Sequence, residues 1–195
     1  MKGKFIVFEG PDGSGQTTQA ELLKHFLTSR GRSAVLTKEP TKESEAGRKI
    51  SDVLNHRLKL SPIEVQELFN ADRKHHIENL ITPSVNEGRY VISDRYFFSS
   101  IAYGPVGYDF ESVHKDFPIP DLTFILKVSP EECIKRIESR GRPVQFYETQ
   151  EKLKKVMANY EKIAGKFPNV YLINGEVSIE KVQEEILGKV KNILE

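Results

Sequence analysis

The chain has little of three things that mark particular classes of protein. Its single cysteine, Cys133, excludes an internal disulfide and a cysteine-based zinc framework. It lacks an apolar run near the ~20 residues that a membrane-spanning helix needs, and the apolar stretch after Lys4 is too short for a signal peptide. Its formal net charge of +1 argues against a nucleic-acid-binding protein, which is usually clearly basic. We therefore expect a cytoplasmic protein that binds neither membranes nor nucleic acids.

What is present is the composition of an ordinary globular protein. Hydrophobic residues make up 38% and charged residues 29% of the 195 residues, a balance that supports a buried core and does not favour disorder. The length suits one domain that spans residues 1–195. In Arg140-Gly141-Arg142-Pro143, glycine and proline lie among arginines, which predicts a small mobile lid at about residues 139–148.

Short apolar runs alternate with longer helical patterns. The helical stretches begin near Gln16, at Ser61-Pro62, at Ser129-Pro130 and near Ser178, and a serine marks the last three starts. The apolar runs are mostly rich in β-branched or aromatic residues, which is typical of buried parallel strands. We predict an α/β fold with a five-stranded parallel sheet flanked by helices, its strands at Phe5–Phe8, Ala34–Leu36, Tyr90–Ile92, Leu122–Leu126 and Val170–Ile173.

The first predicted strand leads directly into a glycine-rich loop and a helix, the order of elements that binds nucleotide phosphates. Glycines let the backbone N–H groups turn inward, and the helix adds its positive N-terminal end. The threonine at position 17 stands where the Walker A pattern places a Mg²⁺-binding hydroxyl. The residues predicted to bind ATP are Gly10, Gly13, Ser14, Gly15, Gln16, Thr17 and Thr18.

One residue of this loop departs from the Walker A pattern G-x-x-x-x-G-K-[ST]. Gln16 occupies the position of the lysine, whose charge normally lies near the β and γ phosphates. Two outcomes stay open. Either the lid arginines Arg140 and Arg142 supply the missing charge, or the protein binds nucleotide and scarcely turns over.

The third predicted strand ends in an acid followed by a base, Asp94-Arg95. In an open α/β sheet, ligands bind at the carboxyl ends of the strands. Asp94 is therefore placed to hold Mg²⁺ together with Thr17, and Arg95 is placed to bind a second phosphate group.

Several short motifs, taken together in their order and spacing, resemble the thymidylate kinase family. The resemblance covers nearly the whole chain. It implies a P-loop NTPase fold, ATP and dTMP as substrates, Mg²⁺ as cofactor and a homodimer. The motifs are Phe8–Gly15, Lys38–Thr41, Leu68–Arg73, Asp94–Tyr96, Ser99–Tyr103 and Pro120–Leu122.

The resemblance also implies which residues bind the dTMP nucleoside. Phe69 would stack on the thymine ring, and Arg73, one helical turn later, would bond a thymine carbonyl. Ser100 would contact the base, and Tyr103 would crowd the 2′ carbon and favour deoxyribose. Tyr147, at the end of the lid, would reach the acceptor nucleotide.

A second set of residues would act on the phosphates, again by resemblance. Asp12 would approach the sugar 3′-hydroxyl and the acceptor phosphate, and Arg95 would bind that phosphate. Arg140 and Arg142 would stabilise the charge on the moving phosphoryl group. Lys42 stands near the sequence position at which some relatives carry a phosphate-binding arginine, and it would replace that arginine.

Departures from the family pattern keep other functions open. Arg48 is a second candidate for the phosphate contact assigned to Lys42, and Gly104 removes one polar contact near the base. A kinase for another nucleoside monophosphate or for a deoxynucleoside therefore remains an alternative. A catalytically impaired nucleotide-binding module is another, because Gln16 replaces the Walker A lysine.

Overall fold

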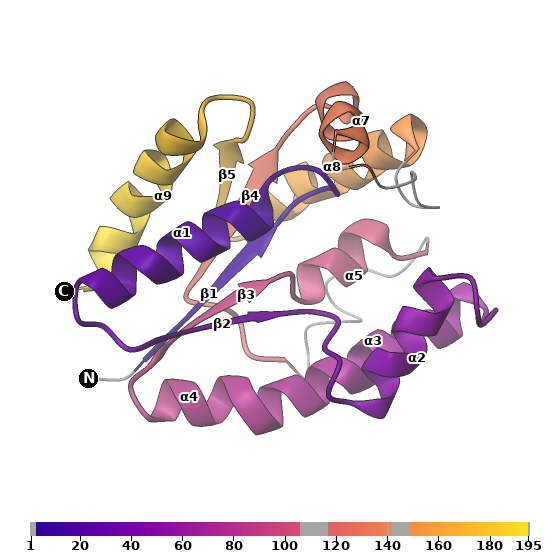
Figure 1. Cartoon of the computed structure of the whole chain (residues 1–195), viewed down its shortest axis with the longest axis horizontal. Helices are drawn as coiled ribbons and strands as arrows, with labels where there is room; N and C mark the ends of the chain where they lie inside the picture. The colour runs from indigo at the N-terminus through magenta and orange to yellow at the C-terminus, as the bar shows by residue number, and fades with distance from the viewer. Residues whose placement is uncertain (1–2, 106–116, 140, 142–148, 195) are drawn as a thin grey trace.

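A five-stranded parallel sheet forms the centre of the computed structural model, which describes residues 3–105, 117–139, 141 and 149–194 (Figure 1). The strand order is β2-β3-β1-β4-β5, and every neighbouring pair is parallel. The predicted α/β fold with five parallel strands is therefore confirmed. The strands are β1 Lys4–Glu9, β2 Ala34–Lys38, β3 Tyr90–Asp94, β4 Leu122–Lys127 and β5 Val170–Asn174.

Strand β1 shows why these apolar runs form buried strands. Side chains alternate between the two faces of a sheet. Phe5 and Val7 pack in one hydrophobic cluster, and Ile6 and Phe8 pack in another on the opposite face. Both faces are covered, so the strand reads as a continuous apolar run rather than an alternating one.

Helices cover both faces of the sheet (Figure 1). Those on one side, α1 and α9, contribute to the cluster around Phe8, whereas α5 and α8 contribute to the cluster around Val7. Ser61 caps α3 in a capping box with Glu64, as the sequence predicts. The helices are α1 Gln16–Ser29, α2 Glu45–Leu54, α3 Pro62–His76, the π-helical η1 Ile77–Ile81, α4 Thr82–Asn86, α5 Phe97–Tyr103, α7 Pro130–Glu138, α8 Gln150–Ala164 and α9 Ile179–Leu194.

The parallel arrangement brings the carboxyl ends of the strands to one edge of the sheet. The glycine-rich loop follows β1, Asp94 ends β3 and Lys38 ends β2. These segments lie far apart in the sequence and meet only through the strand order. Within the described part of the chain, every helix is too short or too polar to span a bilayer.

Candidate active site

The loop at residues 10–18, called here the phosphate loop, has the backbone of an anion cradle. Its three glycines adopt positive φ angles of 152°, 86° and 95° at Gly10, Gly13 and Gly15. A side chain does not fit at Gly13, because a Cβ there would lie 2.5 Å from the carbonyl oxygen of Cys133. Gly15 caps α1 without a side chain, so no capping group takes up the N–H groups of the first helical turn. Such N–H groups are suited to bind phosphate oxygens.

Asp94 is the acceptor on which three donors converge beside the phosphate loop. Gln16 Nε2 donates to its Oδ1 at 2.8 Å, and Thr17 Oγ1 donates to its Oδ2 at 2.5 Å. Lys38 Nζ donates to the same Oδ2 at 2.7 Å and lies 3.5 Å from Thr17 Oγ1. Sequence reasoning gave Lys38 no role beyond its place in a motif, although it forms the ion pair with the buried Asp94 carboxylate.

The same oxygens fit a Mg²⁺ site that is shared with a phosphate ligand. Thr17 Oγ1 and Asp94 Oδ2 are hard oxygen donors that already lie 2.5 Å apart. Mg²⁺ is usually held by one or two protein oxygens together with substrate phosphates and water. Among the described residues, no cluster of three or more His, Cys, Asp or Glu could hold a metal by itself.

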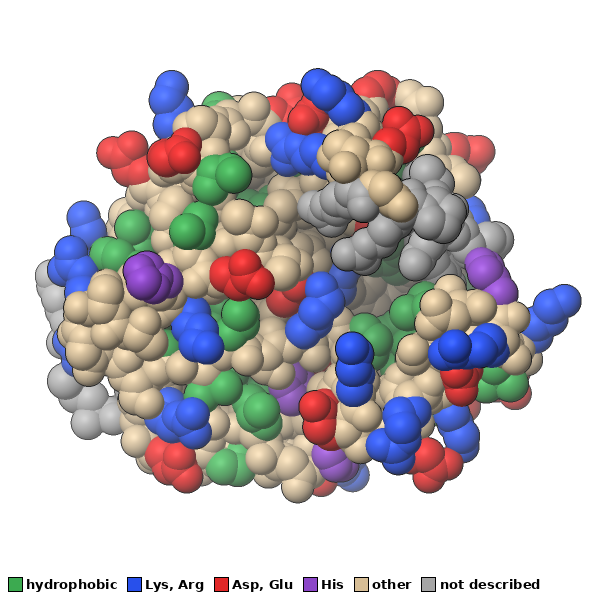
Figure 2. Space-filling model, viewed as in Figure 1, with side chains coloured by type: hydrophobic (Ala, Val, Ile, Leu, Met, Phe, Trp, Pro, Cys, Tyr) green, Lys and Arg blue, Asp and Glu red, His purple; other side chains and the backbone are tan. Residues whose placement is uncertain are grey.

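A pocket of about 140 Å³, called here the Tyr103 pocket, opens beside the phosphate loop. Figure 2 shows that this face of the molecule is hollowed and that its charged side chains are of both signs. Five of the residues that the sequence assigns to substrate line the pocket. The described lining consists of Asp12, Pro40, Leu54, Gln66, Phe69, Arg95, Ser99, Ser100 and Tyr103.

Arg95 joins the phosphate loop to the Tyr103 pocket. Its backbone has a positive φ of 79°, which is unfavourable for a residue with a side chain. Its guanidinium pairs with Asp12 Oδ1 at 2.8 Å and donates to Ser99 Oγ at 3.1 Å. The Tyr103 hydroxyl accepts a hydrogen bond from the Asp12 N–H and donates to Asp12 Oδ2, and burial raises the pKa of Tyr103. The loop acid, the arginine and the tyrosine thus form one unit.

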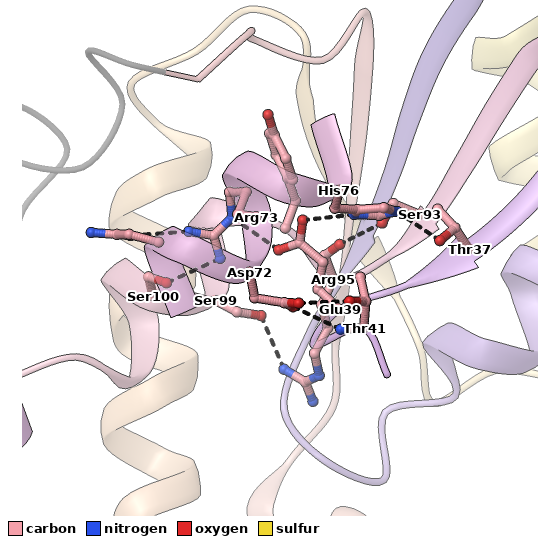
Figure 3. A network of polar contacts seen from close by, with 12 residues as sticks. Thr37, Glu39, Thr41, Asp72, Arg73, His76, Ser93, Arg95, Ser99 and Ser100 are labelled. Atoms are coloured by element: carbon pink, nitrogen blue, oxygen red, sulfur yellow. Dashed lines mark hydrogen bonds and ion pairs between the residues drawn. The ribbon is translucent and has the colours of Figure 1, made fainter. Parts of the chain in front are cut away.

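Behind the pocket lies a buried set of polar residues, the Arg73 network (Figure 3). The side chain of Arg73 is only 1% exposed, and it donates to Glu39 Oε2 at 2.9 Å and to Ser100 Oγ at 3.2 Å. The other Glu39 oxygen bonds His76 Nδ1 at 3.1 Å, and His76 Nε2 lies 2.7 Å from Thr37 Oγ1. Arg73 therefore reaches the pocket lining through Ser100.

A second buried carboxylate, Asp72, fixes the segment between β2 and α2. It accepts hydrogen bonds from the backbone N–H of Thr41 at 2.7 Å, from Thr41 Oγ1 at 2.6 Å and from Ser44 Oγ. The two cations proposed here for a phosphate, Lys42 and Arg48, are exposed and are not among the described residues that line the Tyr103 pocket. Asp72 thus holds the backbone of this segment, while the side chains of Lys42 and Arg48 face solvent.

Glu9, the last residue of β1, holds the start of α5. It is fully buried and accepts hydrogen bonds from the N–H groups of Tyr96 and Ser99, from Ser99 Oγ at 2.6 Å and from the Tyr160 hydroxyl at 2.8 Å. Burial raises the pKa of Glu9 to about 7, against the lowering effect of Arg95 and of these donors. Sequence reasoning gave Glu9 no role, because its partners are distant in the chain.

On the other side of the phosphate loop is a second cavity, the Arg136 cleft. Its described lining includes Ser14, Thr18, Arg136, Gly175 and Ile179. The Arg136 guanidinium is held by Glu132 at 2.8 Å and by the Gly175 carbonyl at 3.0 Å. Among the described residues, Ser14 Oγ and Gln16 Oε1 are buried polar atoms without a hydrogen-bond partner. Such atoms are suited to a ligand or water that completes the site.

Three predicted residues fall outside the described part of the chain. These are Arg140 and Arg142 of the expected lid, together with Tyr147. Of the expected lid range, residues 139 and 141 are described.

A glycine loop between two cavities, with an acid–arginine pair in the wall of one of them, places the chain in the class of P-loop nucleotide kinases. The family model described as thymidylate kinase matches residues 8–186. The chain therefore belongs to the thymidylate kinase family.

Individual relatives match over nearly their full length. The probable thymidylate kinase of Pyrococcus horikoshii is 39% identical, with 100% of this chain and 98% of that protein covered. The thymidylate kinase of Desulfotalea psychrophila is 38% identical, with 98% and 96% covered. A solved thymidylate kinase structure from Candida albicans is 27% identical with a TM-score of 0.82, covering 98% of this chain and 92% of that one. The expected P-loop NTPase fold is thereby confirmed.

Proposed function

We propose that the chain transfers the terminal phosphoryl group of ATP to dTMP, giving ADP and dTDP. Membership of the thymidylate kinase family supports this reaction. The structural observation that carries the proposal is the ion pair of 2.8 Å between Asp12 and Arg95. It links the phosphate loop to a pocket of the right composition for a nucleotide, so a donor and an acceptor phosphate would meet at this pair.

On the donor side, we propose that the phosphate loop binds the phosphates of ATP through its backbone N–H groups. The Arg136 cleft is then the place for the adenosine part, because the planar guanidinium and Ile179 lie at its wall. Thr17 and Asp94 would hold Mg²⁺, which when bound neutralises charge on the donor phosphates. Ser14, with its free hydroxyl oxygen, is placed to contact the same phosphates.

On the acceptor side, we propose that dTMP lies in the Tyr103 pocket. Phe69 stacks on the thymine ring, and Ser100, oriented by Arg73, contacts a polar edge of the base. Tyr103 packs against the 2′ carbon of the sugar. Arg95 binds the phosphate and Asp12 the 3′-hydroxyl, so both hold the acceptor in line with the donor.

Three of the remaining predicted residues, Arg140, Arg142 and Tyr147, lie outside the described part of the chain. Arg140 and Arg142 would stabilise the charge on the transferred group, and Tyr147 would reach the acceptor nucleotide. Lys42 would contact a phosphate from the exposed segment before α2. We also propose that the enzyme is a cytoplasmic homodimer. Light scattering on the purified chain measures its oligomeric state directly.

The test is phosphoryl transfer from ATP to a panel of acceptors, with ADP and the product both measured. The panel contains dTMP, dUMP, ribothymidine monophosphate, CMP, AMP and thymidine. A panel is needed because the Candida albicans relative is described as having broad substrate specificity. The proposal expects the highest kcat/KM with dTMP. A higher value for another acceptor would assign a different substrate, and nucleotide binding without turnover on any acceptor would leave a binding module.

A further inference from the structure

The sheet register places an ammonium group where the phosphate loop lacks one. In the parallel pair of β2 and β3, Lys38 lies opposite Asp94. Opposite residues of neighbouring strands point to the same face, so both side chains leave the carboxyl edge of the sheet together. Their atoms Nζ and Oδ2 lie 2.7 Å apart. Since Asp94 also bonds Gln16 and Thr17, Lys38 stands directly beside the first turn of α1.

Gln16 cannot supply the charge that the Walker A position normally carries. Its amide nitrogen donates to Asp94 Oδ1 at 2.8 Å, and its amide oxygen is buried without a partner among the described residues. A unit charge about 4 Å from phosphate oxygens is worth up to roughly 10²–10³-fold in rate at an effective dielectric near 20. A site that lacked this charge altogether would be strongly impaired.

We propose that Lys38 provides the positive charge of the phosphate site in place of a lysine at position 16. Positions 16 and 38 together would supply the hydrogen-bond donor and the positive charge that a Walker A lysine supplies alone. Gln16 holds Asp94 as a neutral donor, and Lys38 brings the cation from the edge strand β2. This inference rests on the proposed function, because it names the group that would contact the donor phosphates.

Lys38 is suited to this role by its exposure and its number of N–H donors as well as by its position. Its side chain is 57% exposed, and its ammonium has three N–H donors, of which Asp94 takes one at short range. The remaining donors can therefore bind phosphate oxygens while the ion pair with Asp94 persists. Two other cations beside the loop are less exposed: the side chain of Arg95, paired with Asp12, is 14% exposed, and that of Arg136, paired with Glu132, is 28% exposed.

The experiment compares six proteins: wild type, Lys38→Met, Lys38→Arg, Gln16→Lys, the double variant Gln16→Lys/Lys38→Met, and the control Lys127→Met. Lys127 is a matched control, because it also ends a strand, is 58% exposed and pairs with a carboxylate, Glu161, at 2.7 Å. The measurements are steady-state kinetics with dTMP and ATP, and the Kd of ADP without Mg²⁺ by titration calorimetry.

We expect kcat of Lys38→Met to fall by about 10²-fold and its Kd for ADP to rise by about 10-fold. The double variant should recover most of both losses, because a lysine at position 16 restores the charge from the other side of Asp94. Lys127→Met should change these values by less than about 3-fold, and Gln16→Lys alone is the background against which the double variant is compared. Lys38→Arg, which keeps a charge near Asp94, should retain ADP binding and so separates loss of charge from misfolding.

Two results would overturn the inference. One is a Lys38→Met protein that binds ADP and turns over like wild type. The other is a Lys38→Met defect that position 16 fails to rescue, since the defect would then come from a disturbed Asp94. If wild type does not phosphorylate dTMP, the proposed function fails, but the ADP affinities of the same proteins still decide the role of Lys38.

Discussion

The Tyr103 pocket and the phosphate loop are built in different ways, although they share an edge. Buried side chains that bond one another hold the pocket: Arg73, Glu39 and His76 are each 3% exposed or less. The phosphate loop instead relies on backbone shape at its glycines and leaves Ser14 Oγ and Gln16 Oε1 unpartnered among the described residues.

This difference shows which groups fix the geometry of the Tyr103 pocket and which fix that of the phosphate loop. The pocket is set before a ligand binds, because every polar atom of the Arg73 network that moved would leave a buried partner unpaired. The loop has its backbone set, but its charge comes from exposed side chains such as that of Lys38. A preorganised pocket favours selectivity for one acceptor, whereas a loop of backbone N–H groups accepts any polyphosphate of the right shape.

The largest expected effect is the removal of Arg73 from the buried network. Arg73→Met should lower the free energy of unfolding by about 3–5 kcal/mol, because the Glu39 carboxylate stays buried with its main counter-charge gone. Arg57→Met is the control, since Arg57 pairs with Asp52 at the same 2.9 Å but at 64% exposure. Its cost should stay within about 1 kcal/mol. Equal losses in urea denaturation would contradict a preorganised pocket.

The buried carboxyl of Glu9 makes the stability of the pocket half of the site depend on pH. Because burial raises its pKa to about 7, the folded state keeps a proton that the unfolded chain releases above pH 4.5. Its contribution to stability is therefore complete below about pH 4.5 and is lost as the pH rises to about 7. Glu9→Gln lacks this loss, so its stability relative to wild type should rise by about 3 kcal/mol between pH 4.5 and 8.

The measurement is urea denaturation of both proteins across this pH range. The slope against pH carries the information, because the amide also changes hydrogen bonds by an amount that is the same at every pH. Parallel curves for the two proteins would show that the pKa of Glu9 is the same in the folded and the unfolded chain.

The phosphate loop should respond to a change of backbone shape. Gly13→Ala introduces a Cβ 2.5 Å from the Cys133 carbonyl oxygen at a φ of 86°, and we expect a loss of about 2 kcal/mol in stability. ADP binding should weaken at the same time. Gly188→Ala in α9 is the control, because its Cβ would meet open space and should add about 0.5–1 kcal/mol. Unchanged ADP affinity in Gly13→Ala would remove the loop from the nucleotide site.

The smallest effect concerns Tyr103, where the two halves meet. Tyr103→Phe removes the hydroxyl that bonds Asp12, and we expect kcat/KM for dTMP to fall by about 5–10-fold. The preference for dTMP over ribothymidine monophosphate should persist, because the ring still occupies its place. Tyr103→Ala should narrow that preference. If the ratio of the two kcat/KM values is the same in all three proteins, the ring packs without selecting the sugar.

Local sequence patterns were enough to predict the sheet and the phosphate loop. Each strand contains a short, mostly apolar run, and the loop is a contiguous glycine motif, so neither depends on distant residues. The pattern for β2 predicted a strand only to Leu36, because Thr37 and Lys38 are polar. The structure extends β2 to Lys38 by pairing with β3. Lys38 therefore fell outside the predicted strand, and its pairing with Asp94 was not predicted.

The pairing of the site residues was beyond local reasoning. Lys38 and Asp94 are 56 positions apart, and Glu9 and Tyr160 are 151 apart. Such contacts depend on the strand order, which periodicity does not give. The buried bond of His76 to Glu39 likewise follows only from the approach of α3 to the end of β2.

The alternation at the end of β2 has a consequence for changes in chain length. Lys38 turns to Asp94, whereas the next residue, Glu39, turns to Arg73 and continues the ladder through its N–H to the Asp94 carbonyl at 3.0 Å. A substitution at either position alters one half of the site. A single-residue insertion or deletion within Ala34–Lys38 would shift the register and exchange the two directions. It would turn an acid toward the phosphate loop and an ammonium toward the Arg73 network, so this short edge strand should tolerate replacements far better than insertions or deletions.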